Sequence, residues 1–94
     1  MRIVTFYSFF EVSNLIFLEN KIKEFSKKIE IKGNILLGPE GVNGTIAVSN
    51  HSKAITKSFL INLGVDEKNI KISDLNGKRI FNGFKIKKKK EIVT

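Results

Sequence analysis

The sequence predicts an α+β domain of ferredoxin-like topology, with the element order βαββαβ. Three observations support this fold: β-branched and aromatic segments near both ends of the chain, two amphipathic helical segments, and a glycine-rich reversal between two apolar runs. Two helices would then pack on one face of a four-stranded antiparallel sheet and leave the other face open to a partner. The 94 residues are enough for one domain with a single modest core.

The first part of the chain predicts a strand, a helix and a second strand. Residues 2–9 are β-branched and aromatic on both faces, as in a central strand. Ser13 or Asn14 can cap the following helix, because a side-chain oxygen there accepts a hydrogen bond from a free backbone amide. Gly33 separates the helix from a strand over residues 34–37. The apolar stripe of the helix consists of Leu15, Leu18, Ile22, Phe25 and Ile29.

The segment over residues 38–45 predicts a tight reversal. Asn43-Gly44 is its strongest hairpin signal, because both residues tolerate the positive φ angles that primed turns require. Pro39 should end the first strand of the hairpin, since it has no backbone N–H to donate to a neighbour. The returning strand should cover residues 45–49.

A second helix should begin near Asn50 or Ser52 and run to Leu63, with Gly64 as its C′ residue. Its expected core stripe is Ile55, Phe59 and Leu63.

The last part of the chain is less regular. Residues 69–73 alternate like a short strand, and whether they form an additional strand stays open. The final strand is expected within residues 84–93. Because the chain stops inside or just after that strand, we expect residues 1–94 to be one domain of a longer protein.

Composition excludes several kinds of site. The chain has no Cys, which rules out disulfides, thiolate nucleophiles and Cys-based metal sites. Its single His, His51, leaves no His pair for catalysis and is expected at the surface or in a helix cap. No apolar run approaches the roughly 20 residues of a membrane-spanning helix, and residues 1–6 are expected to form a strand rather than a signal peptide. We expect a cytoplasmic chain without a cofactor or a membrane partner.

The net charge of +8 makes an anionic partner plausible, although a Lys-, Ile- and Asn-rich composition is also typical of AT-rich genomes. The position of the charge is more informative. Seven cations lie between residues 78 and 90, a stretch without an acid: Lys78, Arg79, Lys85, Lys87, Lys88, Lys89 and Lys90. They are candidate RNA contacts, and the alternative is an edge strand whose Lys residues prevent aggregation.

Two motifs carry a resemblance to a known family. Residues 33–45, Gly-Asn-Ile-Leu-Leu-Gly-Pro-Glu-Gly-Val-Asn-Gly-Thr, resemble the signature Gly-x-Ile-Leu-Leu-Ala-x-Glu-Gly-Ile-Asn-Gly-Thr of the rhodanese-related tRNA uridine hydroxylases. Residues 81–94 are similar to that family's Phe-Lys-Arg-Met-Lys-Val-Lys-x-Lys-Lys-Glu-Ile-Val-Thr. Where the family has Lys-Arg-Met, this chain has Asn82-Gly83-Phe84, so two expected cations are missing.

The resemblance implies an N-terminal, acylphosphatase-like domain that is non-catalytic alone. In that family a C-terminal rhodanese domain carries the catalytic cysteine, and the enzyme uses oxygen to convert the wobble uridine of certain tRNAs to 5-hydroxyuridine. The implied partners are tRNA and the rhodanese domain of the same protein. An alternative is a structural module that packs on the rhodanese domain without contacting RNA.

The remaining candidates each have a plainer structural explanation. The family motif loop comprises Glu40, Gly41, Asn43, Gly44 and Thr45. Its Gly and Asn residues can be explained by a turn, with Asn43 in the left-handed region, whereas a turn does not require Glu40.

Phe6, Tyr7 and Phe84 could stack on RNA bases, or could fill the core. Stand-alone acylphosphatases bind phosphate through a glycine-rich loop with an Arg after the first strand. Residues 10–14 contain no Gly and no Arg, which argues against acylphosphatase activity.

Overall fold

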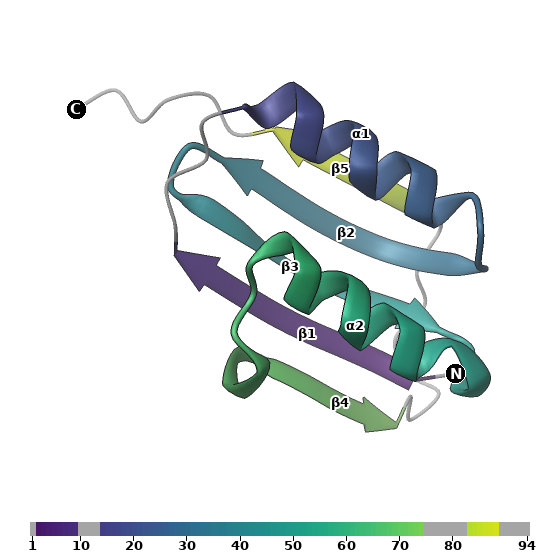
Figure 1. Cartoon of the computed structure of the whole chain (residues 1–94). Helices are drawn as coiled ribbons and strands as arrows, with labels where there is room; N and C mark the ends of the chain where they lie inside the picture. The colour runs from purple at the N-terminus through teal and green to yellow at the C-terminus, as the bar shows by residue number, and fades with distance from the viewer. Residues whose placement is uncertain (1, 10–13, 75–82, 89–94) are drawn as a thin grey trace.

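Two layers make up the protein, a five-stranded mixed sheet and a pair of α-helices that both lie on one face of it (Figure 1). The structure is a computed structural model and describes residues 2–9, 14–74 and 83–88. The strands are β1 (Arg2–Phe9), β2 (Ile31–Gly38), β3 (Gly41–Val48), β4 (Ile70–Asp74) and β5 (Phe84–Lys88). The helices are α1 (Leu15–Ser26) and α2 (Lys53–Leu63), with short 3₁₀ turns η1 (Asn50–Ser52) and η2 (Glu67–Asn69).

The sheet confirms the ferredoxin-like topology and corrects the number of strands. Its order is β4-β1-β3-β2-β5, in which the first four strands pair antiparallel. Residues 70–74, in the segment whose strand character was left open, form β4, the edge strand beside β1. Ile70 pairs with Phe6 and Ile72 with Val4, so β4 places apolar side chains beside the buried residues of β1. The predicted final strand does form, but as a fifth strand, β5, parallel to β2.

The hairpin is tighter and earlier than predicted. Gly38 pairs with Gly41, so Pro39 and Glu40 form the turn, and Asn43-Gly44 lies within β3. Neither turn residue has a positive φ, so the turn is not of a primed type. A reversal at Asn43-Gly44 would have placed Pro39 inside a strand, where it cannot donate a ladder hydrogen bond. The observed register instead pairs Leu37 with Val42, both buried.

The first helix follows its predicted pattern up to Ser26, but it ends before Ile29, and Gly33 lies inside β2 rather than between the helix and the strand. The Asn14 Oδ1 accepts a hydrogen bond from the backbone amide of Phe17 at 3.0 Å, which satisfies a free donor of the first turn. Leu18, Ile22 and Phe25 are buried, as the apolar stripe predicted.

The core stripe of the second helix differs from the prediction at its first residue: Phe59 and Leu63 pack against the core as predicted, whereas Ile55 does not. Ile55 is 52% exposed, while Thr56 and Leu60 are buried. Burial of Thr56 is possible because its Oγ1 donates to the Ser52 carbonyl at 2.8 Å, so the hydroxyl keeps a partner. Gly64 ends the helix with φ 113°, as expected of a C′ residue.

The core lies between the helices and the sheet. Phe25 of α1 and Phe59 of α2 stack with ring centroids 4.1 Å apart and nearly parallel planes, which joins the two helices. The largest fully buried side chains include Phe6, Ile22, Ile35, Leu37, Ile46 and Leu60. Neither α-helix is long and apolar enough to cross a membrane.

Candidate functional site

The face of the sheet opposite the helices is the candidate functional site. Along β1, burial alternates, so that Val4 and Phe6 point into the core and Thr5, Tyr7 and Phe9 are exposed. We call the surface formed by these outward-pointing strand residues the free face.

Strand register places the free-face residues in rows. In one row Tyr7 lies opposite Asn43, Asn43 opposite Leu36, and Leu36 beside Lys87. The row next to it is polar throughout and consists of Lys71, Thr5, Thr45, Asn34 and Lys85. Cations thus occupy the β5 side of both rows, and no acid occupies a free-face position of the five described strands.

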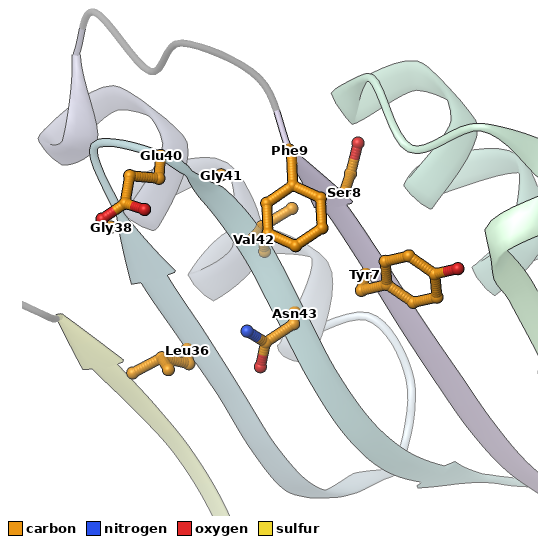
Figure 2. A pocket seen from close by; sticks show the side chains of 9 residues that line it. All are labelled: Tyr7, Ser8, Phe9, Leu36, Gly38, Glu40, Gly41, Val42 and Asn43. Atoms are coloured by element: carbon orange, nitrogen blue, oxygen red, sulfur yellow. The ribbon is translucent and has the colours of Figure 1, made fainter.

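A shallow hollow of about 140 Å³ lies where β1 meets the β2–β3 turn (Figure 2). Figure 2 shows Tyr7 and Phe9 rising from β1, and Asn43 and Leu36 from the adjacent strands, with Glu40 at the turn. Small-molecule pockets usually enclose about 300–1,000 Å³, so this hollow by itself is of a size for one aromatic ring. A second, more open hollow of about 490 Å³ continues along the free face and shares Tyr7, Leu36 and Asn43 with the first.

Two aromatic rings are exposed beside this hollow. Phe9 is 84% exposed and Tyr7 is 49% exposed, and their ring centroids lie 6.2 Å apart in an edge-to-face arrangement. Tyr7 was a predicted stacking candidate. Phe6 is instead buried, and Phe84 packs partly buried against the core. The prediction missed Phe9, although strand alternation places it on the same face as Tyr7.

The predicted cation cluster divides between two faces. Lys85 and Lys87 project from β5 onto the free face, whereas Lys88 lies on the helix side, where its Nζ is 3.2 Å from Glu19 Oε1. The other predicted cations, Lys78, Arg79, Lys89 and Lys90, lie outside the described residues.

Glu19 takes part in two ion pairs, because Lys23 approaches its other oxygen at 3.4 Å. The hydrogen bond from Lys88 is the largest cause that lowers the pKa of Glu19 below its ordinary value. Partial burial opposes this effect, and the positive charge of Lys23 adds to it. Lys88 therefore has a structural role within the domain.

The family motif loop belongs to the turn and to β3. Glu40 is in the turn, and Gly41, Asn43, Gly44 and Thr45 follow in the strand, so the expected left-handed Asn43 is wrong. Gly41 has φ 145°, and a Cβ there would collide with the Ser8 carbonyl oxygen. At Gly44 a Cβ would lie 2.6 Å from the backbone oxygen of Asn34 in β2 and 3.0 Å from Cζ of Phe6. Gly41 thus allows β3 to approach β1 closely, and Gly44 allows it to approach β2.

The described residues contain no group of three His, Asp or Glu side chains that could hold a metal ion. His51 lies exposed in η1, with its Nε2 3.4 Å from Ser49 Oγ. This position at a helix start agrees with the surface or capping role predicted for it.

Comparison with known proteins gives a consistent result. Residues 1–92 match the family described as UPF0176 acylphosphatase like domain. Proteins named tRNA uridine(34) hydroxylase are similar over nearly the whole chain: 36% identity over 96 residues in Prochlorococcus marinus strain MIT 9215, 33% over 92 residues in Acinetobacter baylyi, and 38% over 97 residues in Wolbachia pipientis wMel. These matches cover 97–99% of this chain but only 29–33% of the relatives, so the chain spans about a third of their length.

Proposed function

Because the chain belongs to the UPF0176 acylphosphatase like domain family, we propose that it is the N-terminal, non-catalytic domain of a cytoplasmic tRNA uridine(34) hydroxylase and helps to hold the tRNA. The names of its relatives and the third of their length that it spans support this proposal. A rhodanese domain of the same protein would carry the catalytic cysteine, since this chain has none.

The observation that carries the RNA-contacting role is the position of Lys85 and Lys87. Both are exposed on the free face, next to Asn34 and Leu36 of β2, with no acid at a free-face position of the described strands. Lys71 adds a cation on the opposite edge, in β4. Such cations neutralise phosphates and release counterions, which favours binding to RNA at low salt.

The test measures tRNA binding by the 94-residue chain as a function of salt concentration. We expect binding at about 50 mM salt that weakens steeply as salt rises. Changing both Lys85→Gln and Lys87→Gln should weaken binding and reduce the slope of log K against log salt by about 1.4–1.8.

The matched control is the double change Lys27→Gln and Lys28→Gln, which removes the same charge from exposed residues just after α1. The control should keep the slope of the unmodified chain. Absence of binding at low salt, or equal losses in the two double variants, would contradict the proposed contact.

A second candidate function is a structural module that packs on the rhodanese domain. It is favoured by Phe9, Tyr7 and Leu36, which give the free face an apolar end. In that case changes on the free face would reduce the activity of a full-length hydroxylase and leave its tRNA affinity unchanged.

A further inference from the structure

We propose that the free face binds a single-stranded RNA segment, with one base stacked at Tyr7 and Phe9 and the following phosphates held by Lys85 and Lys87. This inference rests on the proposed tRNA contact and adds to it a site for an unpaired base.

The two exposed rings provide the stacking surface. Phe9, with 84% of its surface exposed, contributes little to the core, and Tyr7 presents its ring beside it. Every nucleobase has a flat π face, so an aromatic side chain on an open sheet stacks bases of any sequence. The hollow of about 140 Å³ between these rings and Asn43 is of a size for one ring system.

Polar residues of the free face determine how the RNA would be oriented. Asn43 adjoins the hollow and can donate to and accept from the edge of a base. Glu40, at the turn, carries a negative charge that repels phosphate, and its carboxylate can accept hydrogen bonds but not donate them. The backbone of the RNA would therefore run on the side of the hollow away from the turn, toward β5.

The distance across the sheet indicates a chain of several nucleotides. Tyr7 and Lys87 belong to one row and are separated by three strand spacings, about 14 Å. The second hollow continues from Tyr7 to Thr5 and Asn34, the neighbour of Lys85. A free nucleotide cannot reach both the rings and the lysines, and a base within a duplex cannot expose a face for stacking.

The first test uses the intrinsic fluorescence of the chain. Tyr7 is its single Tyr, and there is no Trp, so the emission reports on this ring alone. Titration with a short oligouridylate should quench the emission as a base stacks on Tyr7. An abasic ribose-phosphate oligomer of equal length should bind through the lysines without quenching, and N-acetyltyrosinamide titrated in parallel corrects for absorption by the RNA.

The second test measures oligouridylate binding by fluorescence anisotropy. Phe9→Ala and Tyr7→Ala should each weaken binding between about 5-fold and 150-fold, the range measured for loss of one base stack. Tyr7→Phe keeps the ring and should retain most of the affinity. Phe17→Ala is the matched control, because Phe17 is also an exposed aromatic residue, 58% exposed, but lies on α1.

The outcomes separate this inference from the proposed function. Weaker binding by the Lys85/Lys87 double variant, with Tyr7→Ala and Phe9→Ala equal to Phe17→Ala and no quenching, would overturn the stacking site and keep the tRNA contact. It would also leave the two rings available for packing against protein. No binding by the unmodified chain at about 50 mM salt would overturn both.

Discussion

Lys88 on β5 donates to Glu19 on α1, with 3.2 Å between Nζ and Oε1. This contact joins the fifth strand to the helix layer, and it explains why neighbouring lysines of one strand have different roles. Lys87 lies on the free face, whereas Lys88 is paired on the opposite side of the sheet. A run of like charges in the sequence is therefore not one surface patch.

The first prediction concerns the pH dependence of stability. The pKa of Glu19 is lowered in the folded chain, so its carboxylate stabilises the fold at pH values above the unfolded pKa, near 4.5. This contribution is lost as the pH falls through the lowered, folded pKa. The melting temperature of Glu19→Gln should therefore be below that of the unmodified chain at neutral pH, and the difference should vanish in acid.

Glu24→Gln is the control for this experiment, since Glu24 is exposed on the same helix and the charge change is the same. Its melting temperature should follow the unmodified chain more closely at every pH. An equal pH dependence in both variants would contradict the assigned role of Glu19.

The second prediction concerns the aromatic contact between the helices. Phe25 is buried and stacks on Phe59 with ring centroids 4.1 Å apart. Phe25→Ala should lower the free energy of unfolding by about 3–5 kcal/mol, because it removes apolar burial and leaves a cavity. Urea unfolding measures this loss. Phe17→Ala removes an exposed ring that contacts Lys21 Nζ, 5.1 Å from its centroid, and should cost at most about 1 kcal/mol.

The third prediction separates steric conflict from backbone strain. Gly41 and Gly83 both have positive φ, 145° and 137°. A Cβ at Gly41 would meet the Ser8 carbonyl, whereas at Gly83 it would meet no atom of the described residues within 4 Å. Gly83→Ala should cost about 1 kcal/mol, which is the strain alone. Gly41→Ala should cost about 4 kcal/mol or more, because the β1–β3 ladder must also shift. Similar losses of unfolding free energy in the two variants would contradict the close strand approach at Gly41.

The fourth prediction concerns the start of α1. Asn14→Ala should reduce the free energy of unfolding by about 1 kcal/mol, since it removes the acceptor of the Phe17 amide. Asn14→Asp keeps an acceptor at this position and should be nearly neutral. Thermal and urea unfolding of the two variants would check this, and equal losses would exclude the cap as the cause.

Local patterns predicted most elements of the fold but not their partners. The apolar stripe of α1, the helix end at Gly64 and the strand at β1 depend on neighbours in sequence, and all three were predicted. Residues 70–74 pair with the edge of β1 that β3 leaves open, and that open edge is a property of the assembled sheet rather than of the local sequence. The same holds for β5, whose Ile86 lies beside Ile35 of β2.

The candidate site was predicted in part for a similar reason. Alternation along a strand assigns Lys85 and Lys87 to one face and Lys88 to the other once the strand is known. It also places Phe9 on the same face as Tyr7, although Phe9 was not among the predicted stacking candidates Phe6, Tyr7 and Phe84. The Asn43-Gly44 signal failed because Pro39 restricts the hairpin more strongly than a favourable turn pair does.

The strand order has a consequence for how the chain acquires its structure. β1 is made first, yet both of its neighbours, β3 and β4, come later in the sequence, and Arg2 pairs with Asp74. Closing such distant pairs costs chain entropy before any contact compensates for it. Refolding should therefore take milliseconds to seconds, slower than for a helical bundle of equal length, with attachment of β4 as a late step.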